Sequence, residues 1–424
     1  NDLIQKLGEM GLAVEIQDTI TYAPGVNTSS SVQNIMTRID GTNPTGTVML
    51  AAHYDTSFVS PGASDDGYGV AALLEAARLL KDKPLKNNLI ILITDAEELG
   101  LIGAHAFVKE HPWAKEVDLV LNFEARGNTG STVMFETSNG NKNLIKEFQE
   151  ATNYPASNSF LKEVYDVMPN GTDLTEFVRT GMQALNFASA QGFNGYHTTI
   201  DSLAFMNEDT VMHHATYAYA LANHFTNIDL SRIENNTEDN AVYFNVFGHT
   251  LVSYSESFVL PLFILVLLGY IATMYHGIRK KTISIGGTFI GFLLFLLSLV
   301  VTYGFTLAGW KGVSSLLKAK AWLLTYDQQI AGVYLVGFLF LTAAVLIVFT
   351  YLLQKKITAI HMVAGALFGW TLIAGYVSFV MPGASYLFVW PLVFTLIGTN
   401  LLLWKKHSKN TKALLYITLC IPGI

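Results

Sequence analysis

Residues 47–80 have the sequence TVMLAAHYDTSFVSPGASDDGYGVAALLEAARLL. The β-branched and apolar residues at 47–53 predict a strand that ends at His53. Residues 67–80 repeat apolar side chains at helical spacing, so they predict a helix that follows the strand after a glycine-containing loop. A strand followed by a helix is the repeating unit of an α/β fold.

The same alternation continues through the first half of the chain. Further strands are predicted at residues 13–22, 31–39, 88–94, 117–123, 133–136 and 184–188. Further helices are predicted at residues 99–109, 144–152, 174–180 and 208–225. This order implies an α/β domain over residues 1–227, with a mostly parallel, doubly wound sheet flanked by helices. Functional sites in such sheets collect beyond the carboxyl ends of the strands.

The composition divides the chain into two parts. Of its 424 residues, 51% are hydrophobic and 14% are charged, against about 25% charged residues in a typical globular protein. The charged residues are concentrated before residue 230, and the net charge of −7 gives no indication of nucleic-acid binding. The single cysteine, Cys420, excludes an internal disulfide and argues against a cysteine-based metal site.

Residues 228–250 are polar without a clear period and are predicted to form a linker. Six apolar segments follow, at residues 251–275, 283–307, 330–353, 357–380, 386–404 and 413–424. The first five are long enough to cross the ~30 Å hydrocarbon layer of a bilayer, and the sixth is cut short. We therefore expect a multi-pass integral membrane domain over residues 251–424 rather than the core helices of a soluble protein. Because the chain starts without a methionine or a signal peptide and stops inside an apolar segment, we expect both ends to result from truncation or processing.

Basic residues in the short loops predict the orientation of these spans. Residues 279–281, 355–356 and 405–412 carry basic side chains on one side, whereas on the other side lysines occur only between residues 311 and 320. Loops rich in lysine and arginine favour the cytoplasm. We therefore expect the first domain to lie outside the cytoplasm or in a lumen.

Six residues of the first domain lie at predicted strand ends or in the loops that follow, and each has a side chain that can bind a metal ion or accept a proton. They are His53, Asp65, Glu97, Glu98, Glu124 and His197. Imidazole nitrogens and carboxylate oxygens are ligands of zinc, and one carboxylate is left over as a base. Two zinc ions held in this way predict the hydrolysis of an amide bond by a metal-bound water.

Two of these residues also have simple structural explanations. Taken alone, His53 is an ordinary residue at the end of a strand. As a ligand it is expected to be oriented by the carboxylate of Asp55, which lies two residues later on the same side. Asp65 and its neighbour Asp66 precede a predicted helix, so either is also a candidate helix cap.

The remaining candidates leave similar alternatives open. Glu97 and Glu98 can form a solvated acidic turn, although adjacent carboxylates at a strand end are unfavourable without a cation. His197 has a phenol beside it in Tyr196, and Asp201 supplies a carboxylate that can support this site from outside.

Five short motifs occur in a fixed order: His-x-Asp at 53–55, Ser-Asp-Asp-Gly at 64–67, Glu-Glu at 97–98, Asn-Phe-Glu at 122–124 and Tyr-His-Thr at 196–198. Together they resemble the co-catalytic zinc aminopeptidase family, which includes leucine-type aminopeptidases, glutamate carboxypeptidase and glutaminyl cyclase. A peptidase domain followed by several spans resembles the branch of vacuolar and endoplasmic-reticulum membrane proteases. The resemblance by motif covers about residues 48–225.

The resemblance implies a ligand set for two zinc ions. His53 and Glu124 would bind opposite metals, Asp65 would bridge the two, and Glu98 and His197 would complete the two sites. Many soluble members have Asp where Glu124 stands, and relatives often have a cis peptide bond after the bridging aspartate.

The resemblance also implies catalytic and substrate-binding roles. Glu97 would be the general base that activates a metal-bridging water, and Tyr196 would stabilise the oxyanion. Arg126 would bind a substrate carboxylate or pair with a nearby acid. Asp173, in the stretch 170–173, would lie near the substrate cleft or simply belong to a helix cap.

These expectations favour a membrane-anchored aminopeptidase or related exopeptidase that acts on peptides. A catalytically inactive receptor-like relative is an alternative, but all ligands and the base Glu97 are present. Glutaminyl-cyclase-like acyl transfer uses one metal, whereas this chain has all five ligands. A transporter with an accessory peptidase domain is disfavoured because the spans contain few ionisable residues.

Overall fold

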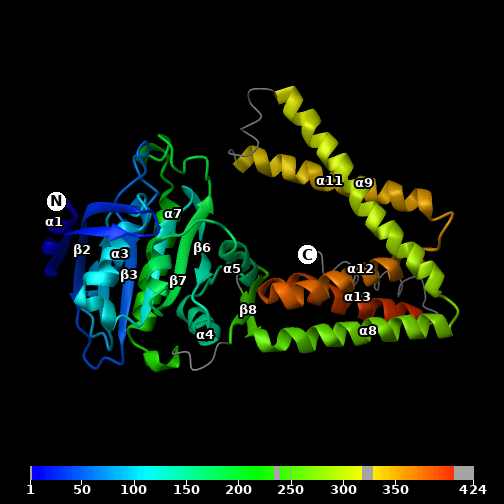
Figure 1. The fold of residues 1–424 in the computed structure, drawn as a ribbon, viewed down its shortest axis with the longest axis horizontal. Helices are drawn as coiled ribbons and strands as arrows, with labels where there is room; N and C mark the ends of the chain where they lie inside the picture. Colours follow the sequence, from blue (N-terminus) through cyan, green and yellow to red (C-terminus); the bar gives the residue numbers. More distant parts are fainter. Residues whose placement is uncertain (1, 234–238, 249, 318–327, 405–424) are drawn as a thin grey trace. The chain divides into compact units, whose positions relative to one another are not determined.

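The computed structural model describes residues 2–233, 239–248, 250–317 and 328–404 (Figure 1). The chain divides into two compact units, Asn1–Ser255 and Glu256–Ile424. The first unit contains strands and helices, and the described part of the second is helical apart from its connecting turns.

A seven-stranded sheet forms the centre of the first unit. Its strands, in spatial order, are β1 (Val14–Ala23), β2 (Thr28–Ile39), β4 (Asn88–Thr94), β3 (Thr47–His53), β5 (Leu119–Ala125), β7 (Gln183–Gln191) and β6 (Thr129–Thr137). The neighbours β4–β3, β3–β5 and β5–β7 are parallel, whereas β1–β2, β2–β4 and β7–β6 are antiparallel. The predicted α/β class is confirmed, and the sheet is mixed, with the parallel order confined to its four central strands.

Helices cover both faces of this sheet (Figure 1). On one face, α2 (Gly67–Leu80) and α7 (Glu208–Phe225) share a core with Val48, Leu50 and Ala52 of β3. On the other face, α3 (Ile102–Glu110) and α6 (Asp173–Val178) pack against Met49 and Ala51. Because side chains alternate along a strand, His53 at the end of β3 points to the face that α3 and α6 cover.

Several shorter elements complete the first unit. They are α1 (Asp2–Glu9), η1 (Pro112–Glu116), α4 (Lys142–Ala151), α5 (Ser159–Asp166), η2 (Leu203–Phe205) and η3 (Leu230–Arg232). The sequence analysis did not predict α1 and α5. The start of α5 has a local signal, since the Asn158 side chain caps the helix by accepting a hydrogen bond from the Leu161 amide.

The linker prediction for residues 228–250 is wrong where the structure describes this segment, since Leu230 and Ile233 belong to the main core and a hairpin follows. A hairpin of β8 (Ala241–Val246) and β9 (Thr250–Ser255) packs onto the first unit. Ala241, Tyr243 and Leu251 belong to the main hydrophobic core. In β8 the consecutive residues Ala241, Val242 and Tyr243 are all buried, whereas the polar residues before this short strand make the segment as a whole polar. The first apolar segment therefore begins after Ser255, not at residue 251.

The second unit consists of long apolar helices. They are α8 (Val259–Arg279), α9 (Ile285–Leu317), α11 (Gln328–Leu353), α12 (Ala359–Val380) and α13 (Tyr386–Trp404), with turns η4 (Glu256–Phe258) and η6 (Pro382–Ala384). Among the described residues, four helices are long and apolar enough to cross a membrane, ending at Arg279, Leu317, Leu353 and Val380. The fifth expected span, in α13, is a shorter apolar helix over Tyr386–Leu401, and the sixth lies outside the described residues.

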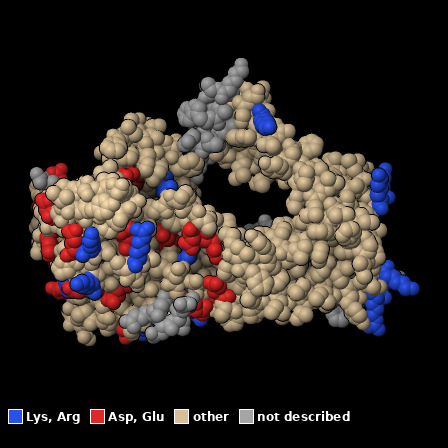
Figure 2. Space-filling model, viewed as in Figure 1, with Lys and Arg blue, Asp and Glu red and all other residues tan. Residues whose placement is uncertain are grey.

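Glycines allow α9 and α12 to approach closely. A Cβ atom on Gly291 of α9 would lie 2.1 Å from the carbonyl oxygen of His361, and one on Gly365 of α12 would lie 2.1 Å from the amide nitrogen of Phe292. Small residues at such crossings are typical of helices that pack within a bilayer. On the face shown in Figure 2, acidic side chains gather on the first unit, while the surface of the second is largely uncharged. These features identify a membrane protein.

The hairpin offers a test of the corrected domain boundary. Tyr243 is fully buried, whereas Phe247 at the turn of the same hairpin is 88% exposed. We expect Tyr243→Ala to lower the free energy of unfolding by about 3 kcal/mol, since it leaves a cavity in the core. Phe247→Ala should change it by less than about 0.5 kcal/mol. Urea unfolding of the detergent-solubilised chain measures both, and equal stability of the two variants would support a loose linker instead.

Candidate metal centre

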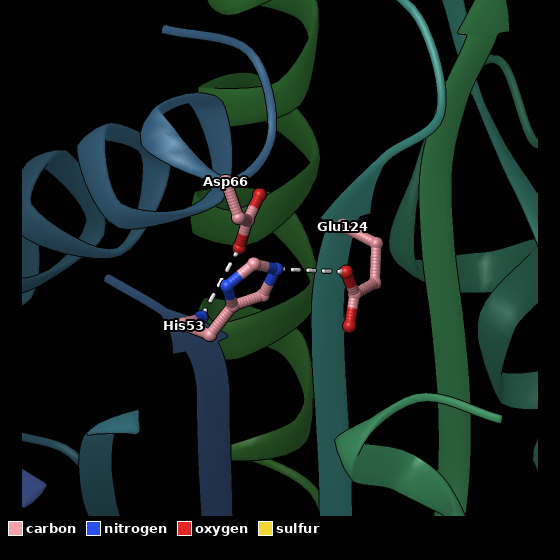
Figure 3. A group of neighbouring side chains, drawn as sticks. All are labelled: His53, Asp66 and Glu124. Atoms are coloured by element: carbon pink, nitrogen blue, oxygen red, sulfur yellow. Dashed lines mark hydrogen bonds and ion pairs between the residues drawn. The ribbon is translucent and has the colours of Figure 1, made fainter. Parts of the chain in front are cut away.

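His53 ends β3 with one ring nitrogen directed at the candidate centre. Its Nδ1 lies 2.9 Å from the backbone oxygen of Asp55, which can only accept, so Nδ1 carries the proton. Nε2 is therefore the ring nitrogen available to a metal, and it lies 3.4 Å from Oδ1 of Asp65 and 3.5 Å from Oε2 of Glu124. Figure 3 shows His53 and Glu124 pointing toward one another from neighbouring strands.

Asp65 lies between two imidazoles. While its Oδ1 faces His53, its Oδ2 lies 3.1 Å from Nε2 of His197. The same His197 nitrogen lies 2.9 Å from Oε1 of Glu98. One carboxylate that offers a separate oxygen to each of two such groups has the arrangement of a bridging ligand.

The predicted assignment of His53 and Glu124 to opposite metals is wrong. These two residues lie together, whereas Glu98 groups with His197 and Asp65. The reason is the parallel pairing of β3 with β5, in which Ala51 is opposite Asn122. The residues two positions further along both strands reach the same point on the same face.

The donor atoms fit zinc ions. Around tetrahedral zinc with bonds near 2.0 Å, neighbouring ligand atoms lie roughly 3.3 Å apart, close to the separations between 2.9 and 3.5 Å in this cluster. Among the described residues, Oδ2 of Asp65, Oε1 of Glu98 and Nε2 of His197 are buried without a hydrogen bond. Buried polar atoms of this kind are stable when they coordinate a cation.

Asp65 and Asp66, each a candidate ligand or helix cap from the sequence, have different roles in the structure. Both oxygens of Asp66 accept backbone hydrogen bonds, from the His53 amide at 3.2 Å and from the Gly69 amide at 3.0 Å. Asp66 is therefore the cap of α2, as its position at the helix start in Figure 3 illustrates. Asp65 keeps its oxygens for the centre, and the peptide bond between the two residues is cis.

Asp201 supports the centre through Asp65. Its carboxylate accepts hydrogen bonds from the amides of Ser64 at 2.8 Å and Asp65 at 3.0 Å, and from the Ser64 hydroxyl. The support from outside the centre that was predicted for Asp201 thus acts on the loop that carries Asp65.

Asp55 links two parts of the site. Its backbone oxygen holds His53, and its carboxylate lies 3.5 Å from the same ring nitrogen. The carboxylate oxygens also accept hydrogen bonds from the amides of Glu97 at 2.9 Å and Glu98 at 3.1 Å. The turn before these glutamates contains Ala96 at φ 57°, a strained conformation of the kind found at functional sites.

Carboxylates outnumber imidazoles here, and this changes proton affinities. Burial, reinforced by the charge of Glu124, raises the pKa of Glu97 well above its ordinary value. Burial, together with the charge of Asp65, raises the pKa of Glu98 to about 7. Burial disfavours the charged ring of His53, but the neighbouring carboxylates outweigh this and raise its pKa. The cluster therefore holds excess negative charge that protons or cations must compensate.

Tyr196 and Arg126 form a stack beside His197. The ring centroids of Tyr196 and His197 are 3.8 Å apart and nearly parallel, and the Arg126 guanidinium lies 5.2 Å from the centre of the Tyr196 ring. Burial raises the pKa of Tyr196 above its ordinary value, so its hydroxyl remains a hydrogen-bond donor. The partner that the structure gives Arg126 is the aromatic ring of Tyr196, and its pairing with a substrate carboxylate or a nearby acid stays a prediction.

Asp173 lies beneath the site, away from solvent. It is 1% exposed and accepts a hydrogen bond from the Thr94 hydroxyl at the end of β4. Burial raises the pKa of Asp173 to about 7. Asp173 is the first residue of α6, and the cap of this helix is Thr172. The contact of Asp173 with substrate stays a prediction.

Sequence reasoning missed two buried asparagines, Asn122 and Asn186, which extend the polar network away from Glu124. The available signal was an amide side chain inside an otherwise apolar strand. The other described histidines of the first unit have partners elsewhere: His105, His111 and His224 each contact a glutamate, and His213 and His214 contact Thr132.

Comparison with known proteins finds a protein family that the sequence matches. Residues 34–222 match the model described as Peptidase family M28. The chain is 28% identical to a vacuolar membrane protease of Vanderwaltozyma polyspora over 255 residues, which are 58% of this chain and 27% of that protein. It is 26% identical to endoplasmic reticulum metallopeptidase 1 of Mus musculus over 231 residues, 53% of this chain and 26% of that protein.

Among solved structures, the LapA aminopeptidase of Legionella pneumophila is 20% identical, with a TM-score of 0.43, and the match covers 54% of this chain and 64% of that chain. The chain spans roughly a quarter of the length of the two curated relatives. The match to the family and the relatives confirms the resemblance predicted from the five motifs.

Zinc and protons should compete for this centre. In the metal-free protein the raised pKa values of His53 and Glu98 keep protons on these groups near neutral pH, and zinc must displace them. We therefore expect zinc affinity to fall as the pH decreases from 8 to 6, by about tenfold per pH unit for each proton released. Competition with a chelator at several pH values measures this, and an affinity that does not change with pH contradicts it.

Proposed function

We propose that this chain, whose residues 34–222 form a zinc metallopeptidase domain of peptidase family M28, is a membrane-anchored di-zinc aminopeptidase. The observation that carries this proposal is the carboxylate of Asp65 between His53 and His197, with one oxygen directed at each. Two cations that share a ligand are the arrangement that hydrolyses peptide bonds in two-metal sites.

Each zinc ion would have its own ligands beside the shared one. His53 and Glu124 would hold one ion and Glu98 and His197 the other, with Asp65 common to both. Bound zinc supplies a Lewis acid that polarises the scissile carbonyl and lowers the pKa of water. The chain's own residues must then move protons and stabilise charge.

Glu97 is the proposed general base. Burial raises the pKa of Glu97 well above that of an ordinary carboxyl, which makes it a stronger base that can accept a proton from the attacking water and return it to the leaving amine. The Asp55 carboxylate fixes the backbone of this residue and of its neighbour Glu98, which keeps base and ligand at a constant separation.

Tyr196 is the proposed donor to the oxyanion. Its hydroxyl stays protonated, and its ring is held between His197 and Arg126, so it can donate without first reorganising. A peptide carbonyl that approaches the centre gains this hydrogen bond as negative charge develops on its oxygen.

The second unit would hold the peptidase at a membrane with its site outside the cytoplasm or in a lumen. Arg279 ends α8 and is followed by Lys280 and Lys281, while Lys355 and Lys356 follow α11. The described basic turns therefore occur at the same end of these helices. The basic end favours the cytoplasm, which leaves the start of α8 on the other side. Protease digestion of sealed vesicles tests this: the first unit should be protected when the vesicles carry the cytoplasmic side outward, and its digestion would contradict the orientation.

Substitutions separate the base from the ligands. We expect Glu97→Gln to retain zinc and lose on the order of 10²–10⁴ in kcat, because it removes proton transfer alone. Tyr196→Phe should lose about 10²–10³ in kcat, the cost of one oxyanion donor. Glu98→Gln, the matched control on the next residue, should instead lower the zinc content. Hydrolysis of aminoacyl-anilides and metal analysis measure these effects.

The same assays separate the alternatives. Wild-type turnover by Glu97→Gln would exclude it as the base. Cyclisation of N-terminal glutaminyl peptides without anilide hydrolysis would indicate acyl transfer. Zinc binding without either reaction would indicate an inactive, receptor-like relative.

A further inference from the structure

Two buried asparagines form a hydrogen-bonded link between Glu124 of the metal centre and β6, an edge strand of the sheet. Asn122 of β5 and Asn186 of β7 are opposite one another in the parallel ladder, and both are fully buried. Asn122 shares a strand face with Glu124, two residues later. Asparagine is depleted in strands and costly to bury, so these two side chains need compensating hydrogen bonds.

The hydrogen bonds fix both amide groups in one orientation. Nδ2 of Asn122 donates to Oε1 of Glu124 at 3.0 Å and to Oδ1 of Asn186 at 3.0 Å. Nδ2 of Asn186 donates to Oε2 of Glu136 at 2.8 Å and to the Thr172 hydroxyl at 2.8 Å. Turning the Asn122 amide over would place its oxygen against two acceptors, so only one orientation is stable.

The hydrogen bond from Asn122 to Oε1 of Glu124 also fixes the position of Oε2, the other oxygen of this carboxylate. A glutamate side chain has three rotatable bonds, and burial alone does not select one of its rotamers. With Oε1 held by Asn122, Oε2 is the oxygen that lies 3.5 Å from Nε2 of His53. The carboxylate therefore presents one defined oxygen to the position that a metal would share with His53.

The far end of the network is also fixed. Thr172 is the residue before α6, and Glu136 lies on β6, opposite Asn186 in the antiparallel pairing. The two asparagines thus connect Glu124 to the start of α6 and to β6, and the hydrogen bonds to these two elements hold Asn186 in place. The stretch at 170–173 contributes to the centre through this contact, since Asp173 itself is enclosed.

We propose that Asn122, held by Asn186, is a positioning residue that orients the Glu124 carboxylate for metal binding beside His53. This inference rests on the proposed metal centre and adds a residue that acts on one of its two ions. Asn122 makes no contact with substrate. Asn122 restricts the Glu124 side chain to one conformation before the metal binds, and this preorganisation raises the affinity for zinc.

Asn122→Leu tests the proposal because leucine has a similar volume and lacks the amide. On the detergent-solubilised full chain, we expect one of the two zinc ions to bind about 10–100-fold more weakly, as is typical when the partner of a ligand is removed. The other ion should keep its affinity. Competition with a chelator of known zinc affinity measures both steps without reference to catalysis.

Asn87→Leu is the matched control. Asn87 is equally buried, donates from Nδ2 to the backbone oxygens of Phe225 at 3.0 Å and Ile228 at 2.7 Å, and lies just before β4, at the opposite edge of the sheet from the centre. Its loss should lower thermal stability and leave zinc affinity unchanged. A purely structural role for Asn122 predicts the same result for both variants.

A second variant keeps the test decisive if Asn122→Leu does not fold. Asn186→Ala removes the acceptor that holds Asn122 and should weaken the same zinc ion. Wild-type affinity in whichever of these variants folds overturns the proposal. If the variants weaken zinc binding but the wild type hydrolyses no peptide, the positioning role stands and the aminopeptidase proposal fails.

Discussion

The contact on which the site depends is that of one carboxylate, Asp65, with two imidazoles. Its two oxygens point in different directions, and each lies within 3.5 Å of a histidine nitrogen. Asp65 alone does not exceed the charge of two imidazoles, but Glu97, Glu98 and Glu124 lie in the same cluster, so the carboxylates outnumber the histidines and leave excess negative charge. Two bound cations would resolve this imbalance, which is why the geometry supports a di-metal centre more directly than any single residue does.

The fold positions this carboxylate through backbone hydrogen bonds. Asp201 binds the amides of Ser64 and Asp65, and Asp66 binds those of His53 and Gly69, so the loop is held from both ends. These supporting acids are buried and use their oxygens on amides, which leaves Asp65 as the one with oxygens to spare. The parallel strands also position the ligands, since their register brings residues of different strands together at the carboxyl ends of the strands.

Much of this could be predicted from the sequence, for physical reasons. His53 and Glu124 each follow a run of apolar residues, and a buried strand that ends in a charged side chain implies a use for that charge. The grouping of ligands was not predictable, because it depends on which strands are neighbours. The hairpin at 241–255 was missed because β8 is only six residues long and follows a polar stretch that dominates the mean composition. The enclosure of Asp173 depends on the packing of α6, which leaves no trace in the local sequence.

Zinc-edge anomalous diffraction from crystals of the chain would show whether Asp65 bridges two ions. Two anomalous peaks are expected on either side of the Asp65 carboxylate, one beside His53 and Glu124 and the other beside His197 and Glu98. A single peak away from Asp65, or the absence of any peak from protein that cleaves peptides, would contradict this arrangement.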